Sequence, residues 1–224
     1  MAKAPMDEII REGLQLKFAY KHKDTTFLMP FFTRWQNESL PITDIEYDRL
    51  SEVEKAIYDV FEMFYVRGQN LHESEYLVVQ NTIDYKVVTK MIGLDTLSSY
   101  SMSELRLLQE GRIDDFRPDI KCRGKKVLYL SDKYLEAVTS FYKSGGFFGK
   151  REFLLPKMKV QPNHWSMKFY YYVTFPDVHE ITFNESLDQA RIIYRATFNT
   201  GRYAIYERSN SGWLMVKDVE KWIE

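Results

Sequence analysis

The chain has 224 residues, and its 31 basic and 32 acidic side chains exclude the strongly basic surface typical of nucleic-acid-binding proteins. Its single cysteine, Cys122, excludes an intrachain disulfide, and no segment carries the run of about 18 apolar residues that a membrane helix requires. A chain of this length buries enough apolar surface to fold without a metal or a disulfide, and we expect a single α+β domain over residues 1–224.

The first part of the chain, residues 7–66, is expected to form a layer of helices. Apolar residues recur at helical spacing over residues 7–22 and predict an amphipathic helix. The expected buried stripe of this helix consists of Ile9, Ile10, Leu14, Phe18 and Ala19.

A second helix is predicted over residues 25–38. Asp24, Thr25 or Thr26 can cap its first turn. Pro30 falls in the first turns, where a missing backbone N–H does least harm.

A third helix is predicted over residues 51–66. Ser51 and Glu54 have the spacing of a capping box, which satisfies the free backbone N–H groups at a helix start. Gly68 is expected to close this helix.

The middle of the chain, residues 76–160, is expected to mix strands with inserted helices. A helix is expected from Ser131 or Asp132 to Lys143, and Gly149 is placed in the loop that follows it. Residues 93–125 have the least regular pattern, with a short helix expected near residues 103–110. Strands are predicted over residues 76–80, 83–88 and 126–130.

The last part, residues 165–224, is expected to form a curved antiparallel meander. Strands over residues 169–174 and 178–183 precede a strand–turn–strand–turn–strand pattern over residues 187–219. Its turns are expected at Thr200-Gly201 and at residues 209–212. Because side chains alternate along a strand, Ala190, Ile192, Tyr194, Ala196 and Phe198 form one apolar row, and Arg191, Arg195 and Thr197 lie on the other.

The residue types that most often carry chemistry form no recognisable set. Cys122 lies in a basic segment that could lower a thiol pKa, but no partner base is identifiable, and a solvated turn is the simpler interpretation. Residues 144–151 resemble a phosphate loop only superficially, because they follow a helix rather than a strand. We expect neither a metal nor another cofactor, because the histidines match no zinc motif. They are His22, His72, His164 and His179.

A cluster of carboxylates has two interpretations. Asp114, Asp115 and Asp119 could perform acid/base chemistry if they were buried together. Helix capping and pairing with Arg112 or Arg117 form the structural alternative.

Tyrosines and two asparagines also have a structural and a functional interpretation. The run over residues 170–172 could line a ligand cavity or simply pack on a half-buried strand. Asn37 and Asn184 begin glycosylation sequons, which matter only on a eukaryotic secretory route.

Helices followed by a curved meander, with a Gly212-Trp213 hairpin and a terminal Trp222-Ile223-Glu224, resemble the NTF2-like cone fold. The resemblance implies that N-terminal helices pack on a curved antiparallel sheet and leave a cavity. Residues 90–160 would then form a large central insertion.

Short phrases along most of the chain also resemble a group of uncharacterised Bacteroidetes proteins. This group implies no activity and no catalytic residues, and some of its members are exported lipoproteins. The phrases are residues 31–35, 57–61, 76–81, 116–118, 128–134 and 221–224.

Three functions remain open from the sequence. The first is a non-enzymatic binding protein that uses a sheet-lined pocket or surface for a small molecule or a protein partner, and the missing catalytic set favours it. The second is a small cone-fold hydrolase or isomerase with a pocket tyrosine and a pocket carboxylate, for which Asp84 and Glu207 are candidates. The third is an immunity-type or assembly protein that acts through its surface.

The sequence limits the possible partners and the possible cellular location without fixing either. We expect no nucleic acid and no transmembrane segment, and a homodimer formed through the sheet stays open. A complete chain would be cytoplasmic, and a chain whose leader was removed would be periplasmic or a surface lipoprotein.

Overall fold

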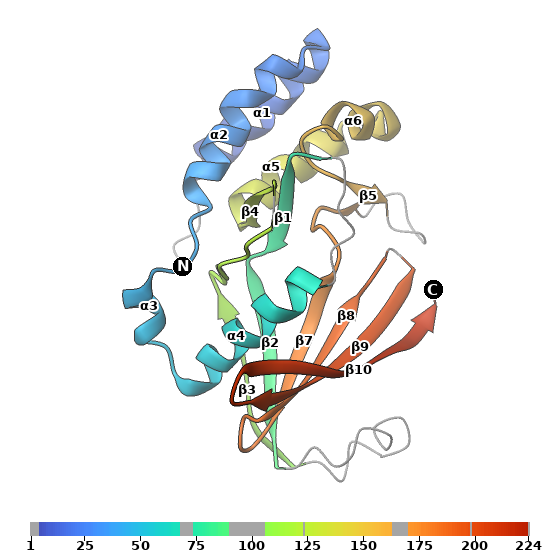
Figure 1. Cartoon of the computed structure of the whole chain (residues 1–224). Coiled ribbons are helices and arrows are strands. Elements are labelled where there is room, and N and C mark those ends of the chain that lie inside the picture. Colours follow the sequence, from blue (N-terminus) through green and yellow to red (C-terminus); the bar gives the residue numbers. More distant parts are fainter. Residues whose placement is uncertain are drawn as a thin grey trace. The chain divides into compact units, whose positions relative to one another are not determined.

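The computed structural model describes residues 5–67, 74–89, 106–122, 124–162, 170–197 and 199–223 (Figure 1). The chain is organised as two compact units. Each unit combines three segments that are distant in the sequence. The first comprises Met1–Pro41, Asn70–Asn81 and Lys121–Thr174, and the second comprises Ile42–Gln69, Thr82–Ile120 and Phe175–Glu224.

The first unit begins with the two helical segments that the sequence predicts. Helix α1 spans Met6–His22. The predicted second helix is a 3₁₀ turn, η1 (Thr25–Leu28), followed by α2 (Met29–Glu38) with Pro30 in its first turn. Asp24 caps the 3₁₀ turn by accepting a hydrogen bond of 2.8 Å from the backbone N–H of Thr26.

The buried face of α1 differs from the predicted one. Ile9 and Ala19 are buried as expected, but Ile10, Leu14 and Phe18 are 51%, 57% and 47% exposed. Both sets have helical spacing, so the pattern alone does not tell which of them faces the core. The prediction that Ile10, Leu14 and Phe18 are core residues is therefore wrong.

The rest of the first unit is built around two parallel strands, β1 (Tyr76–Gln80) and β4 (Lys126–Leu130). Helix α5 (Asp132–Lys143) follows β4 directly, as predicted, and packs against α1. Gly149 lies within α6 (Phe147–Leu154) and not in a loop. Two short strands, β5 (Gln161–Pro162) and β6 (Tyr170–Tyr171), complete the unit.

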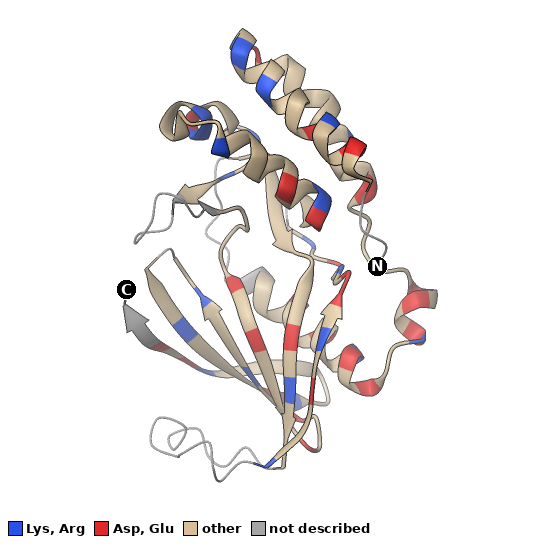
Figure 2. Ribbon diagram, turned by 180° about the vertical axis from the view of Figure 1, so that it is seen from behind, with Lys and Arg blue, Asp and Glu red and all other residues tan. Residues whose placement is uncertain are grey.

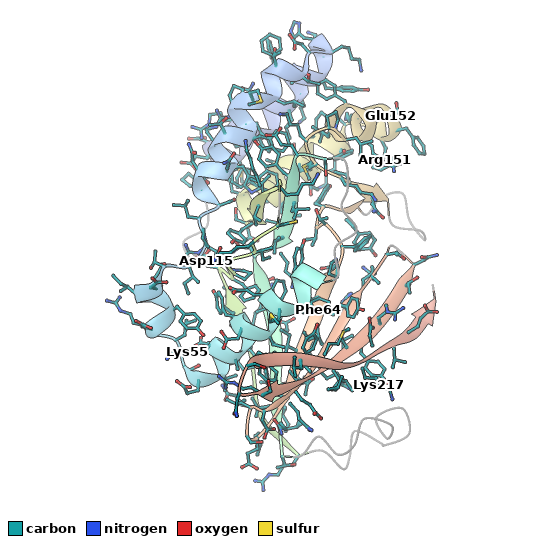
Figure 3. The ribbon with its side chains drawn as sticks, viewed as in Figure 1. Lys55, Phe64, Asp115, Arg151, Glu152 and Lys217 are labelled. Atoms are coloured by element: carbon teal, nitrogen blue, oxygen red, sulfur yellow. The ribbon has the colours of Figure 1, made fainter. Side chains whose placement is uncertain are left out.

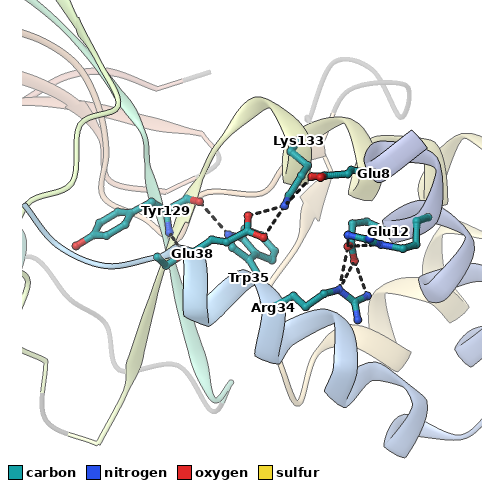
Figure 4. A network of polar contacts seen from close by, with 9 residues as sticks. Glu8, Glu12, Arg34, Trp35, Glu38, Tyr129 and Lys133 are labelled. Carbon is teal, nitrogen blue, oxygen red and sulfur yellow. Dashed lines mark hydrogen bonds and ion pairs between the residues drawn. The ribbon is translucent and has the colours of Figure 1, made fainter. Parts of the chain in front are cut away.

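Buried charges connect α1, α2 and α5 in this unit (Figure 4). Glu12 on α1 is fully buried, and its Oε2 lies 2.7 Å from Nη2 of Arg34 on α2. Lys133 on α5 lies 2.6 Å from Glu38 of α2 and 3.6 Å from Glu8 of α1. These charges have partners of opposite sign on neighbouring helices, which indicates a structural role.

The second unit contains a six-stranded sheet with the strand order β10-β9-β8-β7-β2-β3. Strands β7 to β10 form the antiparallel meander predicted for the end of the chain. The sheet is mixed, because β2 pairs with β7 in parallel and with β3 in antiparallel fashion. The strands span β2 Thr82–Val88, β3 Leu107–Asp114, β7 Asp177–Asn184, β8 Gln189–Arg195, β9 Thr200–Ser209 and β10 Gly212–Ile223.

Two local predictions in this unit are wrong. Residues 107–110 lie in strand β3 and not in the expected short helix, of which residues 103–105 lie outside the described part of the chain. Pairing with β2 decides this segment, because β-sheet contacts override local helix propensity. Strand β8 ends at Arg195 and β9 already begins at Thr200, so Thr200-Gly201 lie in a strand and not in the first turn of the meander. The second turn lies within the predicted residues 209–212.

Helix α4 (Glu52–Arg67) packs on one face of this sheet. It begins at the predicted capping box, in which the side chain of Glu54 accepts a 2.8 Å hydrogen bond from Ser51 N. Phe64 of α4, labelled in Figure 3, packs its ring on Tyr194 and Tyr206, with centroids 4.7 and 6.4 Å away. The face of the sheet that carries these two tyrosines is therefore apolar and covered.

A short helix, α3 (Asp44–Asp48), was not predicted. Its capping box joins Thr43 and Glu46, whose carboxylate also pairs with Arg117 at 2.9 Å. Backbone and side-chain hydrogen bonds from Thr43, with the bond from Arg117, lower the pKa of Glu46 to about 2.

The α+β class predicted from the sequence is confirmed by helices together with a mixed, largely antiparallel sheet. The expected helical layer over residues 7–66 is divided between the units. Helices α1 and α2 belong to the first unit, and α4 packs on the sheet of the second. A single domain over residues 1–224 stays a prediction.

Candidate functional site

The two faces of the six-stranded sheet differ in character. Ala190, Ile192 and Tyr194 on β8 are buried on the face that α4 covers, as the alternation predicts. The side chains between them point to the other face, where Figure 2 shows basic and acidic residues on neighbouring strands. This second face is called the polar face here, and it carries Asp84, Lys86, Asp177, Glu180, Arg191 and Arg195.

Glu180 on β7 is the centre of a half-buried ion-pair cluster. Its carboxylate accepts hydrogen bonds from Nζ of Lys86 at 2.6 Å and from Oγ1 of Thr182 at 2.9 Å. The parallel pairing of β2 with β7 brings Lys86 beside Glu180. Burial raises the pKa of Glu180, but the bonds from Lys86 and Thr182 outweigh it and hold the pKa below its ordinary value. Glu180 is therefore ionised at neutral pH, and Lys86 compensates its charge.

Arg191 on β8 lies directly opposite Thr182 in the β7–β8 register, next to this cluster. Its Nε is buried and donates no hydrogen bond, and among the described residues its guanidinium forms no ion pair. Burial lowers the pKa of Arg191, and the charge of Glu180 partly restores it. A buried donor without an acceptor costs about 1–3 kcal/mol. The Nε–H of Arg191 is thus a buried donor to which no described residue offers an acceptor.

Asp177 and Arg195 form a second pair on the polar face. They lie opposite each other on β7 and β8, with Oδ2 and Nη1 4.0 Å apart. Burial raises the pKa of Asp177, although the charges of His179 and Arg195 oppose this rise. Arg195 therefore has a carboxylate partner, in contrast to Arg191.

A groove of about 420 Å³ runs beside the Lys86–Glu180 pair, bordered by β2, β3 and β7. Asp84 and Arg112 lie on its rim, 3.9 Å apart, and both side chains are more than half exposed. Charges of both signs thus surround an opening that is wide enough for a small ligand or an extended segment.

The two carboxylates proposed for a cone-fold enzyme are not enclosed in a pocket. Asp84 and Glu207 are both exposed, and the strand register places both on the polar face, away from α4. The structure therefore contradicts the version of the enzyme hypothesis that relied on these two residues.

The carboxylate cluster near residue 115 is explained by ion pairs. Asp114 lies 3.2 Å from Arg112, and Asp115 lies 3.2 Å from Arg117. The structural interpretation is confirmed for these two aspartates, and for Asp119 the structure shows a backbone N–H that donates to Glu62 at 2.7 Å.

The described cysteine and histidine candidates belong to no metal-binding cluster. Burial raises the pKa of the Cys122 thiol despite the opposing charge of Lys125, so the thiol is not activated. His22 packs on Phe18, with centroids 4.4 Å apart, and His179 is exposed on β7. His72 and His164 lie outside the described residues, and within the described ones no cluster of His, Cys, Asp and Glu could hold a metal ion.

The segment that resembles a phosphate loop, residues 144–151, has a structural role. Lys150 is buried in α6, and its ammonium donates to the carbonyl of Phe141 at 2.6 Å and to Oγ of Ser144 at 2.7 Å. Lys150 therefore binds the C-terminal end of α5, where the helix dipole favours a cation.

The remaining candidates pack or bond locally. Tyr172 is buried, with its ring centroid 6.0 Å from that of Tyr142. The side-chain amide of Asn184 bonds Ser186 and the backbone N–H of Asp188 within a tight turn.

Sequence reasoning placed Arg191 and Arg195 on the correct face but missed Lys86, Glu180 and Asp177. The available signal was the charged residues inside otherwise apolar strands, at Lys86 in residues 83–88 and at Glu180 in residues 178–183. Their meeting depends on the parallel pairing of β2 with β7, which joins segments 94 residues apart.

Within the ranges that the structure describes, no helix is both long and apolar enough to cross a membrane. Comparison of the chain with protein-family models, with curated proteins and with solved structures found no match. The polar face must therefore be interpreted from its own geometry and charges.

Proposed function

We propose that this protein is a non-enzymatic binding protein, and that the polar face of its sheet takes a ligand or an extended partner segment through a carboxylate or phosphate group. The observation that carries the proposal is Arg191, whose buried Nε has no acceptor in the part of the chain that the structure describes. A ligand oxyanion would supply that acceptor.

The neighbouring charges support an anionic ligand at Arg191 in particular. Lys86 is compensated by Glu180, and Arg195 faces Asp177. Among the described residues, Arg191 is then the cation of this cluster that forms no ion pair with a carboxylate. A guanidinium presents its donors in a planar fork that matches carboxylate and phosphate oxygens, and partial burial strengthens such bonds.

The relation of the chain to known protein families is also a proposal. A helix laid across one face of a mixed, open sheet supports a relation of the second unit to the NTF2-like cone folds. Membership of the uncharacterised Bacteroidetes group is supported by the sequence phrases alone.

Isothermal titration calorimetry with inorganic phosphate, citrate and glutarate tests the proposed function. Wild-type protein should bind at least one of these anions. Arg191→Gln should weaken that binding about tenfold or more, because a charge-assisted hydrogen bond contributes about 1.5–3 kcal/mol.

Arg112→Gln is the matched control. It removes an exposed arginine from the rim of the neighbouring groove. The charge of this arginine is already shared between Asp84 and Asp114. Its effect should be within a few-fold of wild type. Equal losses in the two variants, or no binding of any of the three anions, would contradict the proposal.

A further inference from the structure

The outward face of α1 carries an apolar stripe that the first unit does not bury. Met6, Ile10, Leu14 and Phe18 recur every four residues and are between 47% and 62% exposed. Residues four apart lie on one side of a helix, so these side chains form a single row along it. The row faces away from the buried side of α1, where Leu16 and other residues pack.

A shallow groove of about 470 Å³ follows this row. Its lining consists of Asp7, Ile10, Arg11, Leu14, Gln15 and Phe18. Contiguous exposed apolar surface of this kind typically marks an interaction site.

The two ends of the same side of α1 carry exposed charges of opposite sign. Asp7 lies in its first turn and Lys21 in its last, and both are exposed. Among the described residues neither forms an ion pair. A helix with acid at one end and base at the other is complementary to a second copy of itself that runs in the opposite direction.

The spacing of the residues fits that arrangement in one register. If a two-fold axis passes through Leu14, then Ile10 faces Phe18 of the other copy, because each is four residues from Leu14. Asp7 faces Lys21 in the same way, because each is seven residues from Leu14. One rotation thus pairs the apolar row with itself and each end charge with its opposite.

We propose that α1 is a homodimer interface, in which the helices of two chains pack antiparallel about Leu14. A membrane surface fits the helix less well, because interfacial helices are rich in Lys and Arg on the polar side and α1 carries acids in its first turn. The proposal is independent of the function proposed for the polar face.

Sedimentation equilibrium over a wide range of protein concentration tests the proposal. Wild-type protein should show twice the mass of the chain, and Leu14→Glu should show the mass of one chain. Leu14 is exposed, so this variant should keep the wild-type circular dichroism spectrum and melting temperature.

Charge reversal tests the direction of the helices. Asp7→Lys and Lys21→Asp should each weaken the dimer about tenfold, because the Asp7–Lys21 ion pair occurs twice in a two-fold symmetric dimer and either change removes both copies. The double variant Asp7→Lys/Lys21→Asp should return to within a few-fold of wild type. Asp132→Lys, which reverses an exposed acid in the first turn of α5, is the control and should leave the mass unchanged.

Three results would overturn the proposal. They are a monomeric wild-type protein at every concentration, a dimer that Leu14→Glu does not dissociate, and a double charge variant that is weaker than either single variant.

Discussion

Glu12 and Arg191 are two charged residues that this fold treats in opposite ways. Glu12 is fully buried, and the guanidinium groups of Arg34 and Arg11 donate hydrogen bonds to it. Arg191 is half-buried, and its buried Nε has no acceptor among the described residues. A compensated buried charge holds elements in place, whereas an uncompensated one reduces stability and gains a partner only on binding.

Replacing Glu12 should destabilise the protein strongly. Glu12→Gln leaves Arg34 without its carboxylate, and breaking a buried pair in this way should lower the free energy of unfolding by about 3 kcal/mol. Urea denaturation at neutral pH measures the change. Glu136→Gln, on the half-buried side of α5, is a suitable control.

Glu12 should also make the stability of the protein depend on pH. Burial raises the pKa of Glu12, but the bonds from Arg34 and Arg11 outweigh it, and the pKa lies below its ordinary value of 4.5. A carboxylate with a lowered pKa stabilises the folded state above the unfolded pKa, and this contribution disappears as the pH falls through the folded pKa. The stability difference between wild type and Glu12→Gln should therefore shrink below pH 4.5, and a constant difference down to acid pH would argue against an ionised Glu12.

Arg191 should lower the stability of the folded protein. Arg191→Met removes an unsatisfied buried donor while keeping an apolar stem, and it should raise the free energy of unfolding by about 1 kcal/mol. Arg195→Met provides the comparison, because it leaves Asp177 buried without its partner and should lower stability. Thermal unfolding of both variants measures whether each change raises or lowers stability. A loss of stability in Arg191→Met would show that Arg191 is a structural residue.

At the scale of elements, close packing constrains the edge of the sheet. Gly111 on β3 lies opposite Tyr85 on β2, and a Cβ added to Gly111 would come within 2.6 Å of the tyrosine hydroxyl. That hydroxyl accepts a 3.0 Å hydrogen bond from Gln109. The Tyr85 ring therefore occupies the space that a side chain at residue 111 would need.

Gly111→Ala should displace the Tyr85 ring and cost about 1–2 kcal/mol of stability. In the double variant Gly111→Ala/Tyr85→Leu the clash is absent, so the cost should be less than the sum of the two single changes. A double-mutant cycle by chemical denaturation measures this coupling. Additive losses would mean that the ring and residue 111 do not meet.

Local signals were enough to predict many elements of this fold. The capping box at Ser51 and Glu54 predicted the start of α4, and alternation along residues 189–195 predicted which side chains of β8 are buried. Strand β3 and the orientation of α1 could not be predicted in this way. The first depends on pairing with β2, and the second depends on which of two apolar rows meets α5.

The candidate site was predictable only in part for the same reason. Alternation placed Arg191 on the polar face, because that requires only its own strand. The neighbouring ion pair joins Lys86 of β2 to Glu180 of β7. The parallel pairing of these two strands has no local signal in the sequence.

At the scale of the molecule, the two units are interleaved along the chain. The segment Lys121–Thr174 of the first unit connects strands of the second, and Asn70–Asn81 connects α4 to β2. Melting one unit would convert such segments into long loops, and closing long loops costs entropy.

Heat should therefore unfold the protein in one transition, as a single domain would. Differential scanning calorimetry should give a van't Hoff enthalpy equal to the calorimetric enthalpy. Two separate transitions would contradict the prediction of one cooperative domain over residues 1–224.

Arg191 should gain an anionic partner when a ligand binds to the polar face. The most direct test follows the side-chain Nε–Hε signal of Arg191 by nuclear magnetic resonance during titration with phosphate, citrate or glutarate, after assignment with Arg191→Lys. This signal should shift, and its proton should exchange more slowly with water, once an anion binds. An Arg191 signal that stays unchanged while signals elsewhere shift would contradict this prediction.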